Sequence, residues 1–126
     1  MAMTNYLSNA LANAVVRNTS YTSPADVYCA LYSTAPTTST SGTELSGSGY
    51  SRQAVTFSAP SAGVAASNVA VTFGPASANW TAAVAIGIVD DSTGGNILYF
   101  NTIATQVVLS GASLVLGTGN VTVTMS

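Results

Sequence analysis

The stretch "IVDDSTGGNILYF", residues 88–100, decides the fold class. Two apolar runs flank a turn that contains two adjacent glycines, which is the pattern of a β-hairpin. The apolar run that leads into the turn, from Ala82 to Val89, is far shorter than the roughly 20 residues that a membrane-spanning helix needs. We therefore expect an antiparallel hairpin here and no membrane span.

Further short apolar segments recur along the chain at the spacing of an all-β protein. In "DVYCALYS" (residues 26–33), Val, Cys and Leu alternate with Tyr, Ala and Tyr, which predicts a strand that is partly covered on both faces. "ASLVLGTGNVTVTM" (112–125) predicts a second hairpin that turns at Gly117–Asn120. The other strand candidates are "QAVTFS" (53–58), "NVAVTFG" (68–74), "AVAIGIVD" (83–90), "NILYFN" (96–101) and "TQVVLS" (105–110).

One helix is predicted, near the N-terminus. In "TNYLSNALANAVVRN" (residues 4–18), apolar residues recur at helical spacing after Thr4, a favourable N-cap. The predicted helix covers residues 5–17 and carries Arg17 in its last turn, where a cation complements the helix dipole. We expect a single domain over residues 1–126 whose β-domain begins near residue 26, with an all-β fold of the β-sandwich or jelly-roll-like type.

Charge is unusually scarce in this chain. Only 5% of the residues are Asp, Glu, Lys or Arg, against about 25% in an ordinary soluble domain. The two arginines and the absence of lysine argue against nucleic-acid binding and against adhesion to anionic membranes, because both depend on basic side chains. A surface of hydroxyl and small apolar groups favours a subunit that is largely covered by its neighbours.

The chemistry available for catalysis is limited. Without histidine or lysine, the chain cannot build a Ser-His-Asp, Cys-His or Ser-Lys system or a histidine-containing zinc site, so we expect neither an enzyme nor a cofactor. Asp90 and Asp91 are adjacent in sequence and would point to opposite faces of a strand, which makes them a poor acid-base pair. Cys29 lies in an apolar segment, where an isolated thiol usually behaves as a small buried hydrophobe.

Two binding interpretations remain open. "DDSTGGN" (90–96) could hold calcium through Asp90, Asp91 and Asn96, although a hairpin turn explains the same residues. The aromatic side chains could stack on sugars, although in an all-β protein they are more often core or subunit contacts. These aromatics are Trp80 and the tyrosines at positions 6, 21, 28, 32, 50 and 99.

Three ordered segments together resemble a family of small tailed-bacteriophage virion proteins. They are "YLSNALANAVVRNTSYTSPADVYCALYSTAPT" (6–37), "GTELSGSGYSRQAVTF" (42–57) and "NWTAAVAIGIVDDSTGGNILYF" (79–100). Members of the family are commonly labelled tail-fibre proteins, and similar small β-proteins act as capsid cement, often as trimers.

The resemblance implies a virion structural protein. The function expected first is capsid decoration, in which a homotrimer binds the major capsid protein and stabilises the shell through many weak contacts. The alternative is a tail component, either a fibre or an adhesin domain that contacts host-surface glycans. A small hydrolase is a third and much weaker alternative, because the chain offers no general base.

The resemblance also suggests a role for the arginine in the second segment. Glu44 and Arg52 flank a glycine-rich loop in which nothing else neutralises either charge. We expect them to pair, to hold Gly47, Gly49 and Tyr50 in a fixed turn, and to present this loop to a neighbouring subunit. The alternative is an arginine that is simply solvated beside a turn.

Overall fold

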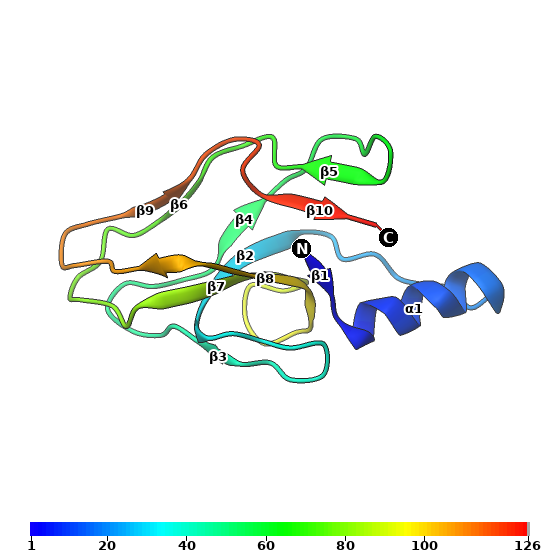
Figure 1. The fold of residues 1–126 in the computed structure, drawn as a ribbon, viewed down its shortest axis with the longest axis horizontal. Helices are drawn as coiled ribbons and strands as arrows, with labels where there is room; N and C mark the ends of the chain where they lie inside the picture. Colours follow the sequence, from blue (N-terminus) through cyan, green and yellow to red (C-terminus); the bar gives the residue numbers. More distant parts are fainter. Residues whose placement is uncertain (126) are drawn as a thin grey trace.

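The computed structural model describes residues 1–125, which form one helix and ten strands. Six strands form a central antiparallel sheet in the order β1-β8-β7-β2-β3, and β4 pairs with the other half of β2. Two two-stranded ribbons, β5–β10 and β6–β9, complete the fold (Figure 1). The bounds are β1 Ala2–Met3, α1 Asn5–Val16, β2 Val27–Thr34, β3 Thr43–Glu44, β4 Gln53–Val55, β5 Val64–Ala66, β6 Val71–Phe73, β7 Ala83–Val89, β8 Ile97–Gln106, β9 Leu114–Leu116 and β10 Thr122–Thr124.

The hairpin predicted over residues 88–100 is confirmed. β7 and β8 pair antiparallel, with Ile88 opposite Tyr99. The segment at 105–110, predicted as a separate strand, is not one: β8 continues through Gln106, and the chain beyond it leaves the sheet. Asn101 is of a residue type common in turns, but it lies inside β8, and the hairpin strand continues past it.

The main core lies between one face of the central sheet and the two ribbons. Cys29 and Leu31 of β2 are fully buried there, together with Phe73 of β6. On the opposite face of β2, Ala30 and Tyr32 belong to a second, smaller cluster of buried side chains. The prediction that both faces of this strand are covered is therefore confirmed, as is the all-β fold with one short N-terminal helix.

α1 is joined to the body of the protein by its first turn. The Thr4 side chain caps the helix by accepting a hydrogen bond from the backbone N–H of Leu7, and Leu7 is the buried residue of the helix. Farther along, Val15 and Val16 are 80% and 76% exposed. Figure 1 shows the helix extending away from the sheet, and its last turn carries apolar surface that residues 1–125 leave exposed. Within residues 1–125, no helix has the length and hydropathy to span a bilayer.

The hairpin predicted over residues 112–125 is wrong. β9 pairs with β6, and β10 pairs with β5, so the two strands diverge after the intervening turn. The turn itself is present, because the N–H of Asn120 donates to the carbonyl of Gly117 at 3.0 Å. Ser67 lies between the two strands and bonds to the turn that joins them. The backbone N–H of Gly119 donates to the carbonyl of Ser67, and the backbone N–H of Ser67 donates to the carbonyl of Val121, both at 2.8 Å. The chain thereby passes from one ribbon to the other.

Candidate functional site

Glu44 and Arg52 form a bidentate ion pair, and the predicted pairing of the two residues is confirmed. The Nε of Arg52 donates to Oε2 of Glu44 at 2.9 Å, and its Nη2 donates to Oε1 at 2.8 Å. The side chains are only 12% and 25% exposed for Arg52 and Glu44, respectively. The hydrogen bonds with Glu44 raise the pKa of Arg52 above its ordinary value. Parallel N–H···O bonds of this kind are stronger and more directional than a single charged contact.

Arg52 also links the loop to the β7–β8 turn. Its Nη1 donates to the backbone carbonyls of Asp91 at 2.8 Å and Gly94 at 2.7 Å. One guanidinium therefore ties two loops that are far apart in the sequence. Sequence reasoning missed these two acceptors, because every residue has a carbonyl and only its position in space makes it a partner.

Tyr50 connects the ion pair to the core. Its hydroxyl donates to Oε2 of Glu44 at 2.7 Å and accepts from the N–H of Leu31 at 3.0 Å. Its ring stacks on Phe73 with centroids 6.1 Å apart and meets Trp80 edge-on at 5.6 Å. Burial, and then the hydrogen bond with Glu44, raise the pKa of Tyr50 well above its ordinary value, so the hydroxyl stays protonated and able to donate.

The glycines of this loop allow its tight turn. Gly47 and Gly49 have φ angles of +75° and +82°, a region that favours glycine. The carbonyl of Ser48 between them accepts hydrogen bonds from the indole N–H of Trp80 at 2.8 Å and from the N–H of Ser77 at 2.9 Å. The structure thus brings together all five of the residues that the sequence singled out. Their role at a subunit interface stays a prediction.

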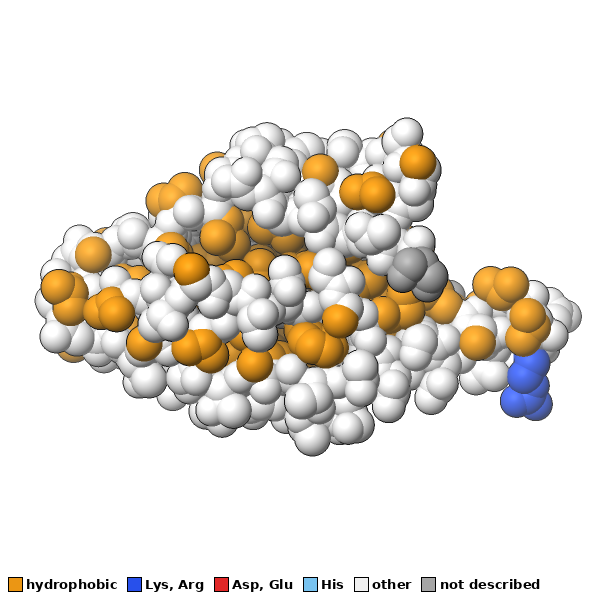
Figure 2. Space-filling model, in the orientation of Figure 1, with side chains coloured by type: hydrophobic (Ala, Val, Ile, Leu, Met, Phe, Trp, Pro, Cys, Tyr) orange, Lys and Arg blue, Asp and Glu red, His pale blue; other side chains and the backbone are white. Residues whose placement is uncertain are grey.

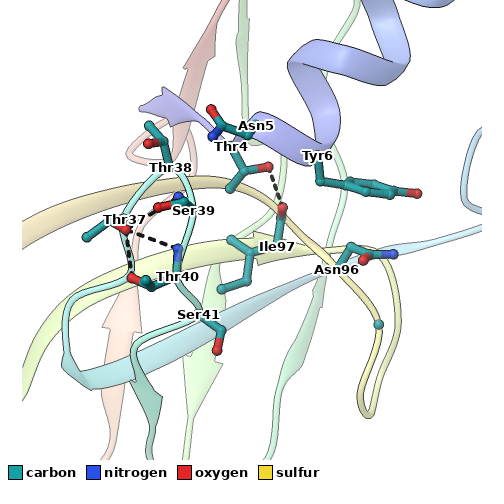
Figure 3. Close-up of a pocket in the computed structure, with 11 residues that line it drawn as sticks. Thr4, Asn5, Tyr6, Thr37, Thr38, Ser39, Thr40, Ser41, Asn96 and Ile97 are labelled. Atoms are coloured by element: carbon teal, nitrogen blue, oxygen red, sulfur yellow. Dashed lines mark hydrogen bonds between the residues drawn. The ribbon is translucent and has the colours of Figure 1, made fainter.

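A pocket that sequence reasoning missed lies beside this loop. It has a volume of about 390 Å³ and is formed by the start of α1, the loop before β3 and the start of β8 (Figure 3). The length and polarity of the segment at 34–49 are the signal in the sequence that could have indicated this region. The lining residues are Thr4, Asn5, Tyr6, Thr37, Thr38, Ser39, Thr40, Ser41, Gly95, Asn96 and Ile97.

Three hydrogen bonds hold the walls of the pocket together. The N–H of Asn5 donates to the carbonyl of Thr38 at 2.9 Å, and the hydroxyl of Thr4 donates to the carbonyl of Ile97 at 2.6 Å. Within the loop, the hydroxyls of Thr37 and Thr40 are 2.6 Å apart. The pocket is therefore preformed by contacts within the chain (Figure 3).

The acidic residues of the β7–β8 turn stabilise the turn. Asp90 accepts from the backbone N–H of Asn96 at 2.7 Å and from its side-chain amide at 3.2 Å, while Asp91 accepts from the N–H of Thr93 at 3.5 Å. These bonds agree with the turn interpretation of "DDSTGGN". Across residues 1–125, no group of three or more Cys, His, Asp or Glu side chains is placed to hold a metal ion.

Cys29 lies in the core, as its sequence context predicted. It is 0% exposed, and burial raises the pKa of its thiol from 9.0 to about 12. At neutral pH the group is therefore a protonated thiol, which is a poor nucleophile.

One comparison with known proteins gives a match. The family model described as "Podophage GP4 fiber I protein gp80" matches residues 2–124. No curated protein matches the chain.

Proposed function

Because the chain belongs to the family of the podophage GP4 fiber I protein gp80, it is a phage structural protein, and we propose that it is a subunit of the tail fibre. The observation that carries this proposal is the match to a fibre family over residues 2–124. Capsid decoration, the function expected first from the sequence, is less well supported, because the family is named for a fibre.

The scarcity of free charge on the surface supports a structural role. The pairing of Glu44 with Arg52 leaves the surface with few free charges, and Figure 2 shows a face without any acidic side chain. Apolar side chains are scattered over that face and gather on the protruding end of α1 (Figure 2). Val15 and Val16 contribute to this exposed apolar surface. Such groups are suited to contacts between subunits, which need few charges.

We include in the proposal that the chain assembles as a homotrimer and has no enzymatic activity. A trimer would repeat each weak contact by symmetry. The scarcity of groups able to transfer protons, together with the buried and protonated Cys29, supports a role without catalysis.

The position in the virion can be tested directly. Purified virions and tail-free heads are compared by quantitative mass spectrometry, and the protein is located by immunogold labelling. We expect the chain to be present in virions, absent from tail-free heads, and present in a copy number close to that of other tail proteins. A copy number that follows the major capsid protein, with retention on tail-free heads, would establish decoration of the capsid instead.

A further inference from the structure

We propose that the pocket between the start of α1, residues 37–41 and the start of β8 binds an uncharged oligosaccharide. This inference stands apart from the location of the protein in the virion, because binding is a property of the isolated chain. It rests on three features of the pocket: the chemistry of its lining, the placement of one aromatic ring, and the rigidity of its walls.

The lining offers hydrogen-bonding groups without charge. It consists of hydroxyl and amide side chains together with Gly95 and Ile97, and it contains no Asp, Glu, Lys or Arg. Hydroxyl and amide groups both donate and accept, as the hydroxyls of a sugar do. A phosphate, sulfate or carboxylate would enter without a cation to compensate its lost hydration, so this lining selects against acidic ligands.

Several of these groups are free to bind a ligand. The side-chain hydroxyls of Thr38, Ser39 and Ser41 take part in no hydrogen bond recorded within residues 1–125. The adjoining hollow contains Glu44 and Arg52, but these two charges neutralise each other. A longer glycan could therefore extend past the pocket without meeting an unpaired charge.

Tyr6 supplies an aromatic face at the pocket. It is 46% exposed and is the one aromatic side chain among the large exposed hydrophobic residues of the described chain. Figure 3 shows its ring leaving the first turn of α1 and extending beside Asn96. An aromatic face next to hydroxyl and amide groups matches the two surfaces of a pyranose ring, which has an apolar C–H face and polar edges.

The walls of the pocket need little reordering when a ligand binds. The backbone bond between Asn5 and Thr38 and the side-chain bond from Thr4 to Ile97 join the three segments that form it. A preformed site keeps more of its interaction energy as affinity, because few groups must be immobilised on binding. A single copy would bind a glycan weakly, so several copies in one assembly would act together.

The test uses the full chain, carrying a C-terminal biotin and displayed on streptavidin, on an array of neutral, sialylated and sulfated oligosaccharides. We expect retention of one or more neutral glycans. For the retained glycan, Tyr6→Ala should weaken binding about tenfold or more, while Tyr6→Phe, which keeps the ring, should stay within about twofold. Leu109→Ala removes another exposed apolar side chain, one that does not line the pocket, and should leave binding unchanged.

Two further measurements separate the site from its fold. Thr38→Val keeps the shape of the loop and removes one free hydroxyl, so it should weaken binding while the urea unfolding midpoint stays constant. Amide chemical shifts with the bound glycan should move at residues 38–41 and at Asn96. Failure to retain any neutral glycan, retention of acidic glycans alone, equal binding by Tyr6→Ala, or shifts confined to another surface would each overturn the proposal.

Discussion

Replacing Arg52 by alanine tests whether the ion pair holds the loop in place. The substitution removes two hydrogen bonds to Glu44 and two to the backbone carbonyls of Asp91 and Gly94. It also leaves the Glu44 carboxylate with the hydroxyl of Tyr50 as its remaining side-chain partner. The loop then loses its connection to the β7–β8 turn.

The size of the effect follows from the burial of the pair. Exposed ion pairs contribute about 0–1 kcal/mol, whereas removing one partner of a buried pair costs about 3–5 kcal/mol. With exposures of 12% for Arg52 and 25% for Glu44, this pair lies between the limits and nearer the buried one. The two carbonyls are at the surface, where water can replace the guanidinium. We therefore expect Arg52→Ala to lower the free energy of unfolding by about 2–3 kcal/mol.

Urea unfolding followed by the fluorescence of Trp80 provides the assay. Trp80 is the single tryptophan and contacts Tyr50, so its emission reports on this loop. In a double-mutant cycle with Glu44→Gln, the coupling energy should be about 1–2 kcal/mol. Arg17→Ala, which removes an exposed arginine at the end of α1, is the matched control and should stay within about 0.5 kcal/mol of the unmodified chain. A loss below about 0.5 kcal/mol for Arg52→Ala, or additive effects in the cycle, would refute the reasoning.

Three other outcomes can be measured on the same protein. Burial raises the pKa of Cys29 from 9.0 to about 12, so the thiol loses its proton at a lower pH in the unfolded chain than in the folded one. The contribution of Cys29 to stability should therefore be complete below about pH 9 and fall as the pH rises toward 12. In urea titrations of Cys29→Ala, the loss of stability should instead begin near pH 10, the ordinary pKa of the tyrosines. An unchanged pH profile in Cys29→Ala would contradict this assignment. Gly87→Ala should lower the unfolding free energy by about 1–3 kcal/mol in urea titrations, because a Cβ at Gly87 would lie 2.9 Å from Cε2 of Tyr32. The Tyr32 side chain is 2% exposed and has little room to move, so a loss below about 0.5 kcal/mol would show that its ring adjusts freely. Val15→Lys combined with Val16→Lys should leave the unfolding free energy within about 0.5 kcal/mol, because both side chains are exposed and cations suit the C-terminal end of a helix. The same double substitution should abolish self-association in sedimentation analysis if neighbouring subunits cover α1, and an oligomer that persists would exclude this part of the helix from the interface.

Much of the local structure was predictable from the order of the residues. The turn between β7 and β8 was predictable because Gly94 and Gly95 lie between two apolar runs, and the helix start because Thr4 precedes residues at helical spacing. The partner of Arg52 was predictable for a different reason: with so few charges in the chain, Glu44 was the nearest group able to neutralise it.

Strand partners were not predictable in the same way. Alternation in a strand shows which face is buried, but it does not say which other strand completes the ladder. The segments that became β9 and β10 therefore read as one hairpin, although each pairs with a strand far earlier in the chain. The short strands β1, β3 and β5 were not expected at all, because two or three residues carry too little pattern to be recognised.

Neighbouring residues and the scarcity of charge were enough to predict the all-β class, the central hairpin, the N-terminal helix and the ion pair between Glu44 and Arg52. Contacts between distant segments were needed to establish where the ribbons pair, which carbonyls accept from the guanidinium, and that Tyr6 and the hydroxyls of residues 37–41 share one pocket. The reason is physical: backbone groups and surface hydroxyls are alike along the whole chain, and only folding brings particular ones within hydrogen-bonding distance.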